Sequence, residues 1–94
     1  MGTKDPDKIH ATEWRAHFET AAQMRRARWR VRSVCECCGT KLRTPLAAAI
    51  KLHGDGFSLW NRTAPCLVEG CTGRVFYEGW PPLCSGYFRL WAAG

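Results

Sequence analysis

Six cysteines carry the clearest chemistry of this 94-residue chain, and four of them form two pairs with the spacing of metal ligands. Cys35 and Cys38 stand in the segment CECCG, where a two-residue gap lets one turn direct both sulfurs toward the same ion. Cys66 and Cys71 form the second pair, in CLVEGC. Zinc accepts four soft thiolates in a tetrahedron, so the two pairs predict one structural Zn²⁺ bound by Cys35, Cys38, Cys66 and Cys71.

The two remaining cysteines have no place in this site. Neighbouring or alternate residues of an extended turn point to different sides, so Cys35 pairs better with Cys38 than with Cys37. Cys37 and Cys84 are therefore expected to be ordinary buried or half-buried thiols, with a regulatory disulfide as the less favoured alternative.

No enzymatic reaction is expected from this pattern. A catalytic zinc keeps one position open for water, whereas four cysteines close the coordination sphere. The chain has no HExxH pattern, and His17 and His53 are expected to hydrogen bond within packed helix faces rather than to bind metal. A redox role for the CxxC pair would need a βαβ scaffold, for which the chain has no room.

Composition and charge limit the classes of protein and partner. A hydrophobic fraction of 46% with five tryptophans excludes a disordered polymer. The sequence shows neither a signal-peptide core nor an apolar run of roughly 18 residues, so we expect a reduced, cytoplasmic protein with no membrane contact. The formal net charge is +6, and a four-thiolate zinc centre would bring it to about +4. This balance favours nucleic acid or an acidic protein surface as partner.

The elements that position the cysteines follow from hydrophobic periodicity. Residues 1–10 are charged and lack a period, so they are expected to be flexible, and residues 11–94 are expected to form one domain. An amphipathic helix is predicted from Ala11 to about Arg26. Its apolar stripe consists of Trp14, Phe18, Ala21 and Ala22.

Each cysteine pair is followed by glycine and a strand-like segment. Two-residue alternation predicts a strand over 28–34, and 41–43 can return antiparallel to it after the first pair. A strand over 74–78 follows the second pair. Between the pairs, Thr44 and Pro45 predict the start of a short helix over 45–53, which ends at Gly54. A strand is also expected over 57–60, and the aromatic tail after Trp80 is expected to be irregular with at most one strand.

The segments CECCGTKLR and PCLVEGCTGRVFYE resemble the two knuckles of the zinc-ribbon family. The resemblance covers residues 29–78 and departs from the family in the helix between the knuckles and in the four-residue gap of the second pair. The stretch from PLAAAIKLHG through SLWNR to CTGRV is also similar to short bacterial zinc-ribbon proteins of unassigned function. The resemblance implies a small α+β zinc ribbon with metal-stabilised hairpins that bind nucleic acid or protein, and it implies no reaction.

An arginine-rich segment is the best guide to the partner, since five of the eight residues 25–32 are arginines. Arginine binds phosphates in bidentate fashion, and an exposed tryptophan can stack on a base. Basic residues also stabilise the thiolates of a metal centre, so a protein-docking adaptor or inhibitor of a regulatory or phage-like kind stays open as the alternative. The expected binding surface consists of Arg25, Arg26, Arg28, Trp29, Arg30, Arg32, Lys41, Arg43, Trp60, Arg62 and Arg74.

Overall fold

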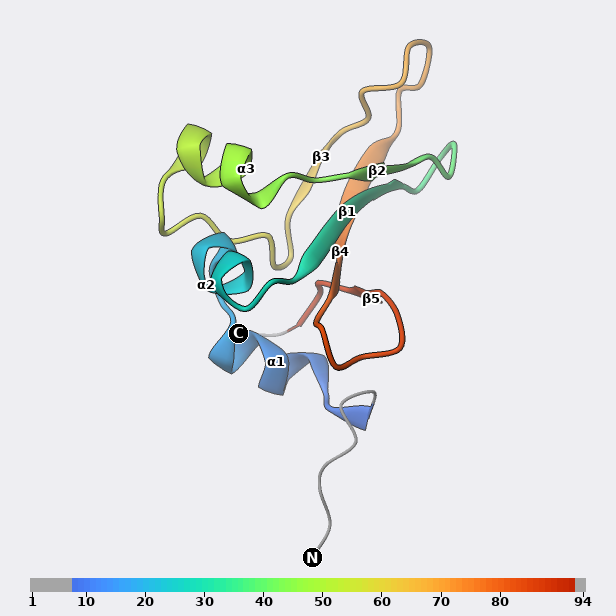
Figure 1. The fold of residues 1–94 in the computed structure, drawn as a ribbon. Helices are drawn as coiled ribbons and strands as arrows, with labels where there is room; N and C mark the ends of the chain where they lie inside the picture. Colours follow the sequence, from blue (N-terminus) through green and yellow to red (C-terminus); the bar gives the residue numbers. More distant parts are fainter. Residues whose placement is uncertain (1–7, 93–94) are drawn as a thin grey trace, which may run out of the picture.

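The computed structural model describes residues 8–92, and within them the chain forms three helices and one antiparallel sheet (Figure 1). The α+β class expected from the sequence is therefore confirmed. The elements are α1 (Ala11–His17), α2 (Ala21–Arg26), β1 (Arg30–Cys35), β2 (Lys41–Arg43), α3 (Leu46–His53), β3 (Thr63–Pro65), β4 (Arg74–Trp80) and β5 (Phe88–Arg89).

The sheet is built around the pairing of its two longest strands, β1 and β4. The strand order is β2-β1-β4-β3, and β5 also pairs with β4. On the outer edge of β4, β3 pairs with residues 74–76 and β5 with residues 78–79, so the two short strands share one edge. The irregular tail thus adds the single strand that the sequence allowed.

The register of the strands gives the sheet two chemically different faces, because side chains alternate along a strand and paired residues share a face. Arg32 pairs with Arg43 on one side and with Glu78 on the other, so all three lie on one face. Ser33 pairs with Leu42 and Tyr77, which lie on the opposite face. We call the first the basic face, after its cations Arg30, Arg32, Lys41, Arg43, Arg74 and Arg89, and the second the apolar face.

Two short helices stand where the periodicity predicted one continuous helix over 11–26. The first ends at Phe18, whose φ of −134° and ψ of 59° are not helical. Thr20 then starts α2 with a capping box, in which its side chain accepts from the amide of Gln23 and the Gln23 side chain accepts from the amide of Thr20. The carbonyl of Phe18 accepts a hydrogen bond from Trp60 Nε1 at 2.8 Å. The capping box at Thr20 and the hydrogen bond from Trp60 therefore favour two separate helices, even though the apolar residues follow the spacing of one.

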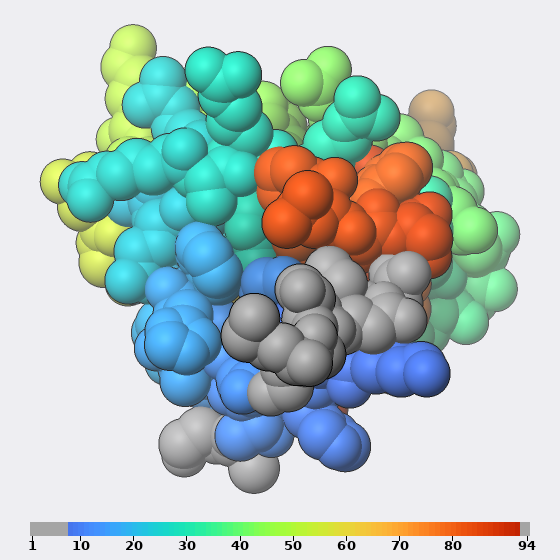
Figure 2. Space-filling view, turned by 60° about the horizontal axis from the view of Figure 1, so that its bottom comes forward, coloured from blue at the N-terminus to red at the C-terminus, as the bar shows by residue number. Residues whose placement is uncertain are grey.

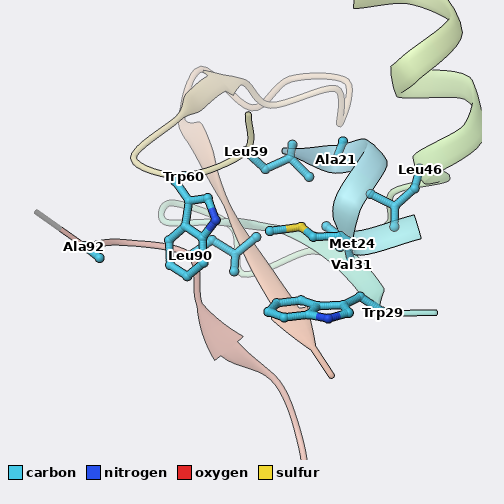
Figure 3. Close-up of a cluster of buried hydrophobic side chains, with 9 residues drawn as sticks. All are labelled: Ala21, Met24, Trp29, Val31, Leu46, Leu59, Trp60, Leu90 and Ala92. Atoms are coloured by element: carbon cyan, nitrogen blue, oxygen red, sulfur yellow. The ribbon is translucent and has the colours of Figure 1, made fainter. Parts of the chain in front are cut away.

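The core lies between these helices and one end of the sheet (Figure 3). Trp29 is at its centre, with its ring 5.1 Å from Phe18 and 5.5 Å from Trp14 between ring centroids. Gly79 lies directly against this ring, since a Cβ there would be 3.0 Å from Trp29 Cε3. The buried cluster consists of Ala21, Met24, Trp29, Val31, Leu46, Leu59, Trp60, Leu90 and Ala92.

The segment after α3 differs from its prediction. Residues 57–60 form no strand, and the edge strand is 63–65 instead. Leu59 and Trp60 are drawn into the core, and the amide of Asn61 donates to the carbonyl of Leu90. The predicted helix over 45–53 is present from Leu46, but Thr44 makes no cap, and the N-cap residue is Pro45.

The three helices gather at one side of the molecule, and the turns that carry the cysteines project from the other (Figure 1). The four cysteines are therefore held by strand pairing rather than by the helical core. Across residues 8–92, every helix is too short or too polar to cross a membrane. The predicted flexibility of residues 1–10 falls largely outside the described part of the chain, which begins at Lys8.

Candidate metal centre and the basic face

The pairing of β1 with β4 brings the two cysteine turns to the same end of the sheet. Cys35 pairs with Val75, and the amide of Glu36 donates to the carbonyl of Arg74 at 3.0 Å. The turn after β1 and the turn before β4 therefore lie side by side, as the green and orange loops of Figure 1 show. Cys35 and Val75, which are 40 positions apart in the sequence, become neighbours through two strands alone.

The four cysteines selected by their spacing converge, and their sulfur atoms all lie within 4.8 Å of one another. The Sγ atoms of Cys35 and Cys71 are 3.6 Å apart, and those of Cys38 and Cys66 are 3.8 Å apart. A tetrahedral ion with metal–sulfur bonds of about 2.3 Å would hold its ligands about 3.8 Å apart. The cluster therefore has the dimensions of a four-thiolate metal site.

Backbone amides surround the sulfurs in a repeated pattern. The amide two residues after each of three cysteines donates to its sulfur: Cys37 to Cys35 at 3.3 Å, Val68 to Cys66 at 3.5 Å and Gly73 to Cys71 at 3.4 Å. Cys38 instead lies 3.2 Å from the Thr40 hydroxyl, which can donate once Cys38 is ionised. These donors stabilise negative sulfur and orient the ligands.

Glycines allow the turns to adopt this form. Gly39 and Gly70 have φ angles of 74° and 83°, in the left-handed region that glycine adopts without strain. Gly73 has a different role, because a Cβ there would lie 2.4 Å from Cys37 Cβ and 3.1 Å from Cys35 Sγ. Only a residue without a side chain lets the second turn approach the first this closely.

The two ligands of the first turn are prepared for ionisation. The amide of Cys38, followed by that of Cys37, lowers the pKa of Cys35 against the opposing effect of burial. The Thr40 side chain and backbone lower the pKa of Cys38 to about 6. Both thiols therefore lose their protons more readily than an ordinary cysteine.

The two ligands of the second turn behave in the opposite way. Although the amide of Val68 lowers the pKa of Cys66, burial and the sulfur of Cys35 raise it overall. The amide of Gly73 likewise lowers the pKa of Cys71, but burial and the other three sulfurs raise it to about 12. Four adjacent negative sulfurs repel one another, so a dication is needed for all four to ionise together.

The other potential ligands lie outside the cluster. Cys37 is exposed on the first turn, and Cys84 is buried beside Trp80, whose indole nitrogen donates to the Cys84 carbonyl at 2.6 Å. His17 is exposed, and His53 is exposed with its ring stacked on Phe57 at 4.3 Å. The prediction that these histidines lie on packed helix faces is therefore wrong. Neither histidine belongs to the cysteine cluster.

The basic face brings together some of the cations that the sequence singled out. Arg30, Arg32, Lys41 and Arg43 line one open groove of about 500 Å³ between β1, β2 and the loop before β5. Arg74 lies on the same face, where its guanidinium donates to Thr63 Oγ1. Within residues 8–92, only two cations of this face pair with carboxylates: Arg32 with Glu78 at 2.7 Å and Arg89 with Glu36 at 3.1 Å.

Aromatic rings lie under the arginines of this groove. The Arg32 guanidinium carbon is 3.9 Å from the centroid of the Tyr87 ring, and that of Arg30 is 5.4 Å from the Trp80 ring. Trp80 and Tyr87 themselves meet edge to face at 5.3 Å. Tyr87 was not predicted as a site residue, because the tail around it has no period and only the pairing of β5 with β4 brings it here. Figure 2 shows this loop, in orange-red, between the N-terminal helices and the residues of the first hairpin.

The remaining predicted contacts lie elsewhere, and two of them are wrong. Trp29 and Trp60 are only 6% and 4% exposed, so neither can stack on a base. Both rings instead belong to the buried hydrophobic cluster of the core. Arg25 and Arg26 end α2, and Arg28 adopts a left-handed φ of 61° in the turn after it. Arg62 covers the ring of Phe57 away from the groove.

Comparisons with known proteins add no assignment, since no family model, curated protein or solved structure matches the chain. The likeness to zinc ribbons therefore stands on the cysteine cluster and on its place in the sheet. What these findings support is a four-cysteine metal-binding module in an antiparallel sheet.

Proposed function

We propose that this protein is a non-catalytic module in which one Zn²⁺ joins the two turns and the basic face binds nucleic acid. The convergence of four sulfurs within 4.8 Å of one another carries the first part. Thiolate ligands favour zinc among the common divalent ions of proteins, and four of them leave no open position for a reacting water. The metal then acts as a structural support.

Native mass spectrometry tests the metal assignment. Protein purified without added metal should carry one zinc ion, and the Cys35→Ser/Cys66→Ser double variant should carry none. The Cys37→Ser/Cys84→Ser double variant is the matched control, because both thiols lie outside the cluster. Full zinc content in the first variant would refute the four-ligand site.

The basic face supports the second part of the proposal. Arg30, Lys41, Arg43 and Arg74 have no carboxylate partner within residues 8–92. Unpaired cations on one face attract the phosphates of nucleic acid, and each phosphate contact releases a counterion. Lys41 and Arg43 line one groove, which places two such contacts along a short path.

Salt dependence tests nucleic-acid binding. Affinity for an oligonucleotide should fall linearly in a log–log plot against salt, and each of Lys41→Ala and Arg43→Ala should reduce the slope by about 1. Arg62→Ala is the control, since Arg62 lies outside the groove. Affinity that does not change with salt would reject this function.

One observation favours protein docking as the second candidate. On the apolar face, a groove of about 380 Å³ runs between β2 and β3, with Ser33, Val75 and Tyr77 among its lining residues. Two exposed leucines border it, Leu42 at 44% and Leu67 at 87% exposure. Exposed leucines that gather at one groove are typical of binding surfaces. Docking there would be insensitive to salt and would be lost in Leu67→Ser.

A further inference from the structure

The two guanidinium–ring pairs of the basic face suggest which form of nucleic acid it takes. Arg30 lies over Trp80 and Arg32 over Tyr87, and the two rings contact each other. Arg89 also lies over a ring, that of Phe76 at 4.1 Å. Its guanidinium additionally lies 5.0 Å from the Trp91 ring and pairs with Glu36, so these contacts already engage it. The groove therefore contains two adjacent arginines, each with one side resting on an aromatic ring.

Arg32 is held in place before any ligand binds, and Arg30 lies over the Trp80 ring. Arg32 donates from Nε to Glu78 at 2.7 Å, which together with the Tyr87 ring holds the guanidinium in place. Its side chain nevertheless remains 27% exposed, and Arg30 is exposed. A guanidinium with one side on a protein ring can present its other side to a nucleic-acid base, because guanidinium planes stack on bases.

The spacing of the two arginines distinguishes a single strand from a duplex. Arg30 and Arg32 are two residues apart on β1, so their Cα atoms are about 6.6 Å apart. That distance exceeds the roughly 3.4 Å rise per base of a duplex strand, so neighbouring bases that stack on the two arginines must lie farther apart than in a duplex. Bases in a duplex are also stacked on both sides, whereas the bases of an extended single strand have free faces.

We propose that the groove binds single-stranded nucleic acid, with two bases stacked on the guanidinium groups of Arg30 and Arg32 while Lys41 and Arg43 contact the phosphates. This inference rests on the proposed nucleic-acid function and adds to it that bases, and not only phosphates, contribute to affinity. Stacking tolerates any base, so binding should show little sequence preference.

The test compares a fluorescent 12-nucleotide deoxythymidine strand with a 12-unit abasic strand of equal charge, at low salt and with zinc-loaded protein. The thymidine strand should bind at least about tenfold more tightly, since stacking of two bases together contributes that much or more. Arg30→Lys/Arg32→Lys keeps the charge but removes both planar groups. This variant should bind the two strands equally, with affinity for the abasic strand unchanged.

Arg62→Lys is the matched control, because Arg62 lies 4.4 Å from the Phe57 ring outside the groove, and its replacement should leave the tenfold preference intact. If the double variant loses its zinc or its fold, the single variant Arg30→Lys is tested instead. Arg30 pairs with no carboxylate within residues 8–92, so its replacement breaks no ion pair of the fold. The preference of this single variant for the thymidine strand should then be reduced. Equal, salt-dependent binding of both strands by the wild type would overturn base stacking and leave phosphate binding standing. No binding of either strand would overturn both.

Discussion

At the scale of single residues, Gly73 decides how closely the two cysteine turns approach. A Cβ at this position would lie 2.4 Å from Cys37 Cβ, so Gly73→Ala must push the first turn aside. We expect zinc affinity to fall about tenfold to a hundredfold, because the groups that orient the ligands lose their alignment. Competition with a chromophoric chelator measures this change.

Gly86→Ala provides the comparison for this variant. A Cβ at Gly86 meets nothing within 4 Å, and its φ lies outside the left-handed region. Zinc affinity should stay at the wild-type value. Equal affinity in Gly73→Ala and Gly86→Ala would show that the turns do not touch at Gly73.

Thr40 controls the proton that competes with zinc at Cys38. Its side chain is the largest cause of the lowered pKa of Cys38, which is about 6. Thr40→Val removes the hydroxyl and raises this pKa, so protons compete better and zinc is released at a higher pH during acidification. Zinc release followed with a fluorescent indicator from pH 8 to pH 4 measures the shift. Thr63→Val, which removes a hydroxyl on β3 that accepts from Arg74, should leave the release curve unchanged.

At the scale of elements, Trp29 joins α1 and the turn before α2 to the sheet. Its ring contacts Trp14, Phe18 and Phe88 and lies against Gly79. Trp29→Ala should lower the free energy of unfolding by about 3–5 kcal/mol, because it leaves a large cavity among these elements. Urea unfolding at fixed zinc concentration measures the loss.

Trp91 is the matched position for this experiment, since it is 46% exposed at the surface. Trp91→Ala should change the free energy of unfolding by about 0.5 kcal/mol or less. Comparable losses in the two variants would mean that Trp29 does not organise the core.

The sequence predicted the parts of this fold that local patterns determine. The cysteine spacing identified the four clustered sulfurs, and alternation identified the two central strands. It missed features that distant contacts decide: the break at Phe18, whose carbonyl accepts from Trp60, and the loss of a strand at 57–60. The groove residue Tyr87 was missed for the same reason, because its position depends on the pairing of β5 with β4.

At the scale of the whole molecule, the metal site and the aromatic core occupy opposite ends of the sheet (Figures 1 and 3). The long turns carrying the cysteines have few buried side chains of their own, so the proposed ion would supply much of their stability. Removing zinc with a chelator should therefore lower the melting temperature and accelerate amide exchange, most of all at residues 35–40 and 66–73. Hydrogen exchange with and without chelator measures this. Uniform protection in both states would contradict a structural role for the ion.

One strand serves both ends of the molecule and both of its faces. On β1, Val31 and Cys35 have odd positions and belong to the core and the metal cluster, whereas Arg30 and Arg32 have even positions and belong to the groove. Inserting or deleting a single residue between them would exchange inside and outside along the strand. Natural variants of this protein are thus expected to preserve the number of residues between Trp29 and Cys35.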